Sequence, residues 1–154
     1  MELLWARRNE RIVKAKGAVE FDRNGYKNIV FLHVLFFISL LFEKILFHRE
    51  LNQLWYVFLI IFILAQFLRY WAIYSLGFYW NTKVLVIPGA KIVNRGPYKF
   101  VNHPNYLAVL IEIAVIPVIF SCYYTSLFFT ILNILILKRR IKIEETALKK
   151  AKVV

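Results

Sequence analysis

Long apolar runs alternate with short polar segments along this chain of 154 residues. Two such runs occupy residues 29–47 and 54–75, and each has about the 20 residues that a helix needs to cross the apolar core of a bilayer. The segment between them, residues 48–53, is mostly polar and too short for anything but a turn. The pattern therefore predicts two transmembrane helices that lie antiparallel and form a first hairpin.

A third apolar run, residues 106–137, has the length of one long tilted helix or of two shorter helices. Pro117 and the polar Ser121 favour a break, because proline removes a backbone hydrogen bond and obstructs the preceding helical turn. We therefore predict a second hairpin, with spans at about 104–121 and 124–141.

The segments outside the spans complete the predicted fold. Residues 2–16 have a helical pattern with few apolar positions, which suits an interfacial or membrane-exiting helix, and Gly17 stands where helices commonly end. Residues 81–94 are rich in Val and Ile and contain a Pro-Gly pair, which is typical of extended chain with a turn. The whole chain is expected to form a single all-α membrane domain with a loop at 81–106 and a C-terminal tail at 138–154.

Composition supports a membrane protein, since 60% of the residues are hydrophobic and 18% are aromatic. The net charge of +12 comes from basic blocks that flank the apolar runs, so nucleic-acid binding is not expected. The single cysteine, Cys122, excludes an intramolecular disulfide. The three histidines, His33, His48 and His103, show no ligand spacing, so no metal site is expected.

The charge distribution predicts the orientation of the two hairpins. With two hairpins, the N-terminal segment, the segment 76–105 and the C-terminal tail all fall on one side, together with almost all of the cations. The other side keeps little more than Lys44 and Arg49. The positive-inside rule places the basic side in the cytoplasm. A single long third helix would instead put His103 and the C-terminal carboxylates on opposite sides of the bilayer.

The polar segment before the third apolar run contains candidate functional residues. Pro104 biases His103 toward extended backbone and is suited to the first turn of the next helix. The imidazole is therefore expected at a membrane-edge loop. Tyr98 and Tyr106 place amphipathic rings at the same level, although tyrosine at that level is also typical of an aromatic belt.

The basic tail contains two adjacent carboxylates, Glu144 and Glu145, on the predicted side of His103. Arg140 precedes Glu144 by one helical turn, so the alternative for these two residues is a simple surface ion pair. Carboxylates beside a cluster of cations are suited to binding a cationic cofactor next to an anionic substrate.

Polar residues inside the predicted spans are also candidates, because they are costly there. Gln66, Arg69 and Glu112 belong to this group. The alternative is an intramembrane ion pair or hydrogen bond that fixes helix packing. His33 and Asn133 are expected to serve in packing or hydrogen bonding rather than as ligands.

Three segments occur in a distinctive order, and they are Gln66-x-x-Arg69-x-x-Ala72-x-x-x-Leu76-Gly77-x-x-Trp80, Val93-x-x-Gly96-Pro97-Tyr98-x-x-x-x-His103-Pro104-x-Tyr106 and Arg140-x-x-x-Glu144-Glu145-x-x-Leu148. Each segment is a weak signal alone, but the ordered combination over residues 66–148 is specific. It resembles the isoprenylcysteine carboxyl methyltransferase family, and in particular its short bacterial members.

The resemblance implies a membrane-embedded methyltransferase that uses S-adenosylmethionine without a soluble Rossmann-type domain. The positions that it implies for cofactor binding are Lys91, Val93, Tyr98, His103, Pro104, Tyr106 and Glu145. Arg140 and Glu144 correspond to the family's catalytic pair near the acceptor group. Arg69, Trp80 and Glu112 are the candidate substrate-binding residues.

The implied acceptor is lipophilic, either a prenylated cysteine carboxylate or a small molecule such as an alkylpyrone, methylated on a carboxyl, enol or hydroxyl oxygen. The acceptor would enter from the bilayer and the cofactor from the cytoplasm. Methyl transfer from a sulfonium is an in-line displacement, so much of its rate comes from proximity and orientation.

Three features depart from the family pattern. Asn102 precedes the histidine where the family usually has arginine, so that charge is absent or comes from Arg95 or Lys99. The chain ends six residues after Leu148, whereas longer relatives continue with an aromatic-containing tail. Relatives also often have another span before the first helix, so we expect a shortened or incomplete member of the family.

Two other functions are compatible with parts of the pattern. Membrane reductases that use NADPH share a related C-terminal architecture, but they need a larger cofactor pocket than the loops of this chain are expected to build. A non-catalytic scaffold that binds anionic lipids would explain the cations but not the combination of Tyr98, His103, Glu144 and Glu145. The oligomeric state stays open, and a homo-oligomer is one possibility.

Overall fold

The computed structural model describes residues 2–90 and 93–152, and within these ranges most of the chain is helical. The α-helices are α1 (Glu2–Ala15), α2 (Arg23–Leu46), α3 (Trp55–Leu76), α4 (Pro104–Ile119) and α5 (Tyr123–Lys152). The shorter elements are the strands β1 (Val19–Phe21) and β2 (Val84–Val86) and the 3-10 helices η1 (Gly77–Tyr79) and η2 (Gly96–Lys99). The prediction of an all-α fold is confirmed.

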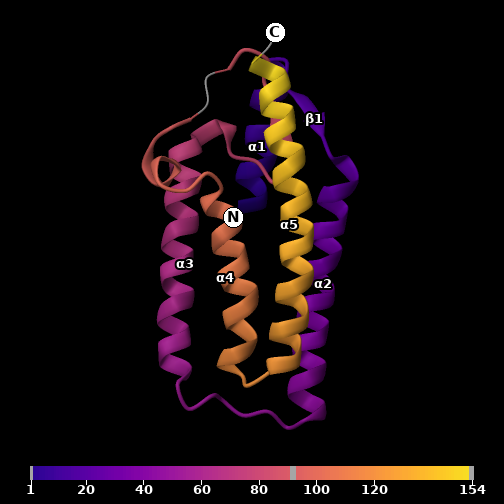
Figure 1. The fold of residues 1–154 in the computed structure, drawn as a ribbon, viewed down its shortest axis with the longest axis vertical. Helices are drawn as coiled ribbons and strands as arrows, with labels where there is room; N and C mark the ends of the chain where they lie inside the picture. Colours follow the sequence, from indigo (N-terminus) through magenta and orange to yellow (C-terminus); the bar gives the residue numbers. More distant parts are fainter. Residues whose placement is uncertain (1, 91–92, 153–154) are drawn as a thin grey trace.

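Four long helices stand in the spatial order α3, α4, α5, α2 (Figure 1). α4 packs against α3 and α5, and α5 also packs against α2. The shorter α1 lies behind this row, toward the end where the chain terminates (Figure 1). The last two helices of the chain, α4 and α5, are therefore the central helices of the row.

The predicted first hairpin is only partly right. α2 and α3 run antiparallel as predicted, but they stand at opposite edges of the row (Figure 1). Their connection passes across the end of the α4–α5 pair, where the Asn52 backbone N–H donates to the Ile119 carbonyl at 3.0 Å and the Asn52 side chain donates to the Tyr123 hydroxyl at 2.8 Å. A connection of eight residues in extended form reaches roughly 26 Å, so it spans the row rather than making a tight turn.

The predicted break in the third apolar run is confirmed. α4 begins at Pro104 and ends at Ile119, and Pro117 lies in its last turn. The Cys122 N–H donates to the Pro117 carbonyl at 2.8 Å, which closes the turn into α5. α5 then continues without interruption to Lys152, so residues 138–152 are the end of the same helix rather than a separate tail.

The N-terminal segment connects to the predicted extended segment through a small sheet. α1 ends at Ala15, and Gly17 has a φ of +82°, a backbone conformation that favours glycine. β1 follows and pairs antiparallel with β2. β2 lies in the segment predicted to be extended, whereas β1 was not predicted, because a strand of three residues has little local signal and depends on its distant partner.

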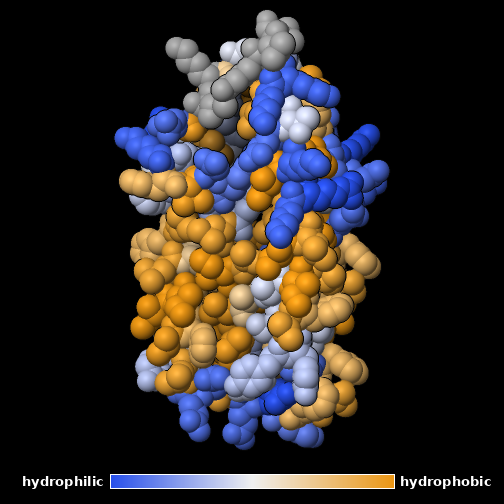
Figure 2. Space-filling view, viewed as in Figure 1, coloured by the Kyte–Doolittle hydropathy of each residue, from blue (hydrophilic) through white to orange (hydrophobic). Residues whose placement is uncertain are grey.

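A broad apolar band crosses the middle of the visible face, and hydrophilic residues gather at both ends (Figure 2). α2 and the helical stretch Trp55–Tyr79 are long and apolar enough to cross a membrane, and α4 is a shorter apolar helix. Only 22% and 17% of the most apolar stretches of the two long helices are buried inside the protein. A core helix of a soluble protein would be mostly buried, so this surface is consistent with a membrane protein.

The interior between the helices is mainly apolar. Leu32 and Phe36 of α2 pack with Ile113 of α4 and Phe129 of α5. Asn133 is 1% exposed in the same region of α5, in keeping with the predicted packing role. The ring of His33 contacts the Ile29 carbonyl one turn earlier at 2.7 Å, so it too has a local hydrogen-bonding role.

Candidate functional site

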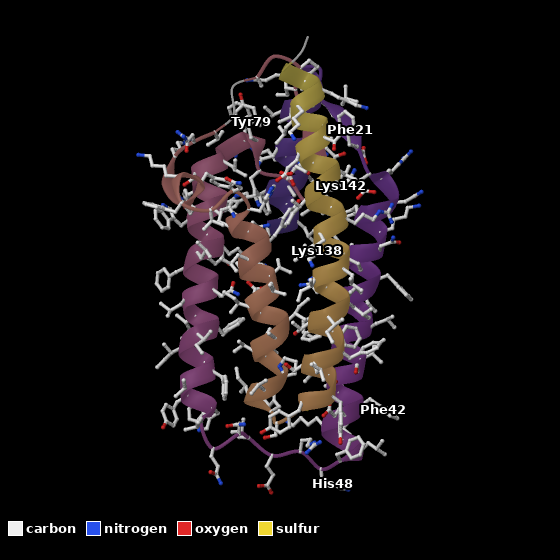
Figure 3. The ribbon with its side chains drawn as sticks, in the orientation of Figure 1. Phe21, Phe42, His48, Tyr79, Lys138 and Lys142 are labelled. Atoms are coloured by element: carbon white, nitrogen blue, oxygen red, sulfur yellow. The ribbon has the colours of Figure 1, made fainter. Side chains whose placement is uncertain are left out.

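A half-open cavity lies at the end of the bundle where α5 terminates. Its walls come from η1, β2, the loop after β2, the start of α4 and the end of α5. The lining residues are Leu76, Tyr79, Trp80, Asn81, Leu85, Val86, Ile87, Ala90, Val93, Tyr98, Asn102, His103, Asn105, Tyr106, Glu144, Leu148 and Ala151. Tyr79 and Lys142 lie toward this end of the molecule, whereas Phe42 and His48 lie at the other (Figure 3).

The loop that contributes to the cavity is held against the end of α3. Gly96 has a φ of +59°, and a Cβ atom there would lie 2.0 Å from the Ser75 Oγ. Only glycine allows this close approach without displacing Ser75. Arg95 Nε also donates to the Ser75 carbonyl at 2.7 Å. These contacts fix the start of η2 and therefore the position of Tyr98, which follows within it.

His103 precedes the first turn of α4, and its carbonyl accepts from the Tyr106 N–H at 3.1 Å. The His103 and Tyr106 rings are stacked, with centroids 5.4 Å apart and an interplanar angle of 10°. His103 Nε2 lies 3.4 Å from Glu145 Oε1, and Nδ1 lies 3.9 Å from Glu144 Oε2. The imidazole is therefore placed between a tyrosine ring and the two carboxylates of the tail.

Tyr106 is the centre of a hydrogen-bonded group. Its hydroxyl donates to Glu144 Oε2 at 2.6 Å and accepts from Arg140 Nε at 2.9 Å. Arg140 is 5% exposed, and its Nη2 also donates to the Thr82 carbonyl. A buried guanidinium is tolerated when its N–H groups have such partners. The phenol thus joins the arginine and the glutamate, which are one turn apart on α5.

Tyr98 presents a second phenol to the cavity. Burial raises the pKa of Tyr98 above its ordinary value, and the negative charge of Glu144 raises it further. The hydroxyl is therefore protonated at neutral pH and is available as a hydrogen-bond donor beside a carboxylate.

The structure brings together several residues of the predicted cofactor site. Val93, Tyr98, His103 and Tyr106 line the cavity, as does Glu144, which the sequence assigned to the acceptor side. The other assigned residues have different positions. Pro104 is buried at the start of α4, Glu145 is exposed beside His103, and Arg140 lies behind Tyr106. Lys91 lies outside the described residues.

Of the three predicted substrate-binding residues, Trp80 lines the cavity and Arg69 and Glu112 do not. Arg69 Nη2 donates to Glu112 Oε2 at 2.6 Å, and Gln66 Nε2 donates to Glu112 Oε1 at 2.8 Å. Arg69 also lies 3.5 Å from Glu2 of α1. This cluster joins α1, α3 and α4, which corresponds to the packing alternative for these residues.

The asparagine that replaces the usual family arginine, Asn102, lines the cavity itself. Neither Arg95 nor Lys99, the two cations considered as substitutes, is among the lining residues. Sequence reasoning also did not identify Asn81 and Asn105 as lining residues. Asn105 occupies the unspecified position between Pro104 and Tyr106, so a pattern of fixed positions gave no signal for it.

Comparison with known proteins shows which family the chain is similar to. Residues 58–150 match the model of the isoprenylcysteine carboxyl methyltransferase family. The Bacillus subtilis protein YpbQ, described as uncharacterized, is 43% identical over 148 residues, which is 96% of this chain and 88% of that protein. An uncharacterized Haemophilus influenzae protein is 30% identical over 142 residues, which is 92% of this chain and 83% of the relative. No solved structure matches the chain.

Proposed function

Because the chain belongs to the isoprenylcysteine carboxyl methyltransferase family, we propose that it is a membrane methyltransferase that uses S-adenosylmethionine. The acceptor is lipophilic and is methylated on a carboxyl, enol or hydroxyl oxygen. The observation that carries the proposal is the convergence of Tyr98, His103, Tyr106 and Glu144 on one cavity, although the loop and α5 are far apart in the sequence.

The cavity fits the cofactor in two respects. One wall is apolar, with Leu85, Val86 and Ile87, which suits an adenine ring, and Glu144 supplies a carboxylate that favours a positively charged group. The Trp80 indole N–H is buried at the wall and has no hydrogen-bond partner among the described residues, so a bound molecule could accept from it. When bound, S-adenosylmethionine supplies an electrophilic methyl group on a sulfonium.

In this proposal, the residues of the cavity bind and orient the cofactor and the acceptor and balance their charges. They do not act as strong acids or bases. The Glu144 carboxylate favours positive charge in the cavity, and Tyr106 holds that carboxylate in place. Arg140 holds the Tyr106 oxygen from the other side and provides positive charge for an anionic acceptor. Because these groups already have hydrogen-bond partners, they need little reorganisation during methyl transfer.

In the membrane arrangement that we propose, α2, α3, α4 and the first part of α5 cross the bilayer, and the cavity faces the cytoplasm. The positions of the cations support this arrangement. Lys138 lies near the middle of α5, and Lys142 lies on the half toward the cavity end (Figure 3). Exposed cations also occur on α1 at this end. A basic cytoplasmic end follows the positive-inside rule.

The test is calorimetric titration of the detergent-purified protein with S-adenosylhomocysteine. We expect saturable binding that Glu144→Gln weakens by about tenfold, because one charge-assisted interaction is lost. Glu50→Gln is the matched control, since Glu50 is an exposed carboxylate in the connection at the opposite end. The proposal fails if the folded protein does not bind S-adenosylhomocysteine, or if NADPH binds in its place.

A further inference from the structure

The helix α1 has two chemically distinct faces. Ala6 and Val13 are buried against the rest of the protein, and Ala6 packs with Ile73 and Trp80. The opposite face carries three exposed arginines, Arg7, Arg8 and Arg11, and two exposed leucines, Leu3 and Leu4. These positions follow the spacing of three and four residues that places side chains on one side of a helix.

The contacts of α1 with α3 show how far along the bundle the outer face of α1 lies. Near the start of α1, Glu2 contacts Arg69 of α3, and farther along the helix, the Asn9 side chain donates to the Gly77 carbonyl at 3.1 Å. α1 therefore runs alongside the last two turns of α3. Leu3 and Leu4 therefore lie at the height of the apolar part of α3. The three arginines of α1 lie near the end of α3, where that helix would leave the bilayer core.

The acidic residues of α1 do not neutralise these arginines. Glu2 contacts Arg69, and Glu10 contacts Lys14 and Lys83 at 2.7 Å each. Within the described part of the chain, none of the three arginines forms a salt bridge. The positive charge of the outer face is thus left for a partner outside the chain.

The surface between the arginines is hollowed and partly apolar. A shallow groove there is lined by Leu4, Arg7, Arg8, Arg11 and Ile12. Guanidinium groups bind phosphate with paired hydrogen bonds, and cations near the end of a membrane helix attract anionic lipids. A phosphate at the arginines would leave an attached acyl chain next to the leucines, one turn deeper.

We propose that the outer face of α1 binds an anionic phospholipid of the leaflet that surrounds the cavity end. Arg7, Arg8 and Arg11 contact the phosphate of the headgroup, and Leu3 and Leu4 contact an acyl chain. This lipid site is separate from the cavity, and it requires no methyltransferase activity.

The experiment measures how lipids change the unfolding temperature of the full chain in detergent. The probes are short-chain phosphatidylglycerol, phosphatidylcholine of the same chain length, and glycerol phosphate. We expect phosphatidylglycerol to raise the unfolding temperature more than either of the others, because a ligand that binds only the folded protein stabilises it.

The variants test whether the arginines of α1 carry this effect. In Arg7→Gln/Arg8→Gln/Arg11→Gln, the rise caused by phosphatidylglycerol should fall to less than about half. The control Lys142→Gln/Lys149→Gln/Lys150→Gln removes the same charge from exposed positions of α5 and should keep most of the rise. Arg7→Lys/Arg8→Lys/Arg11→Lys keeps the charge without the paired hydrogen bonds, and an intermediate rise is expected.

Three results would overturn the proposal. An equal loss in the α1 and α5 glutamine variants would mean that net charge alone attracts the lipid. An equal rise with glycerol phosphate would mean that a free phosphate suffices and that no acyl chain is bound. The absence of any rise with phosphatidylglycerol in the parent protein would mean that there is no such lipid site.

Discussion

At the scale of single residues, the hydroxyl of Tyr106 links the two residues that we propose as the catalytic pair. It lies between the Arg140 guanidinium and the Glu144 carboxylate, and its ring is stacked on His103. The family resemblance implied that Arg140 and Glu144 lie near the acceptor group. The structure joins them through the Tyr106 phenol, with Glu144 at the cavity wall and Arg140 behind the ring.

Tyr106→Phe is expected to weaken S-adenosylhomocysteine binding by about fivefold to thirtyfold, because Glu144 loses a donor and the buried Arg140 loses an acceptor. Calorimetric titration measures the affinity. Tyr123→Phe is the matched control, since it removes a hydroxyl that accepts from Asn52 at the opposite end of the bundle. Equal affinities of Tyr106→Phe and the parent protein would contradict the role given to this hydroxyl.

Glu112→Gln is expected to lower the unfolding temperature while leaving S-adenosylhomocysteine affinity unchanged. The substitution removes the negative charge that faces Arg69 inside the bundle, which typically costs about 3–5 kcal/mol for a buried pair. Thermal unfolding and titration of the same preparation measure both quantities. A variant with parental stability and weakened binding would show instead that Glu112 acts at the cavity.

At the scale of elements, the cavity depends on segments that are held by contacts outside it. β1 pairs with β2, whose residues Val84 and Val86 pack against Ala147 of α5. Nearby, Lys83 and Lys14 bind Glu10 of α1, and these hydrogen bonds hold the pKa of Glu10 below its usual value. The N-terminal segment thus supports the wall of the cavity without lining it.

Gly96→Ala is expected to destabilise the protein more than Gly89→Ala. Both glycines have a positive φ, so each alanine costs about 1–2 kcal/mol of backbone strain. At Gly96 the new Cβ would also lie 2.0 Å from the Ser75 Oγ, whereas at Gly89 no atom of the described residues lies within 4 Å. Thermal unfolding of the two variants compares them directly, and equal destabilisation would contradict the close approach of η2 to α3.

At the scale of the whole molecule, the apolar band and the basic end together favour one orientation in a membrane. The band covers the middle of the face that Figure 2 shows, and α1 and the last turns of α5 lie at one end (Figure 1). The cavity lies at that end, between β2, the start of α4 and the end of α5. In the proposed reaction, the lipophilic acceptor would approach from the band and the water-soluble cofactor from the end. The two-sided environment therefore suits a reaction between a lipid-soluble and a water-soluble molecule.

The orientation can be tested with single cysteines in a Cys122→Ala background. Glu50→Cys, in the connection between α2 and α3, should react with a membrane-impermeant maleimide in intact cells. Lys149→Cys, near the end of α5, should react only after the cells are opened. The positive-inside rule places the end of α5 in the cytoplasm, so the cysteine at position 149 should be protected from the reagent in intact cells. The reverse labelling pattern would refute the proposed cytoplasmic cavity.

The sequence predicted the features that depend on nearby residues. The apolar runs gave the long helices, Pro104 gave the start of α4, and Pro117 together with Ser121 gave the break before α5. The two-hairpin pattern also put the His103 segment and the C-terminal carboxylates at one end. These predictions succeeded because helix length, proline geometry and hydrophobic patterning act over a few turns of chain.

The sequence by itself therefore determined the long helices, their directions and the placement of the His103 segment and the C-terminal carboxylates at one end. Only the tertiary structure decided that α4 and α5 separate α2 from α3, that β1 pairs with β2, and that the Arg69–Glu112 pair lies away from the cavity. It also placed Tyr106 between Arg140 and Glu144. These outcomes depend on contacts between segments distant in the chain, whose energies no local pattern of residues specifies.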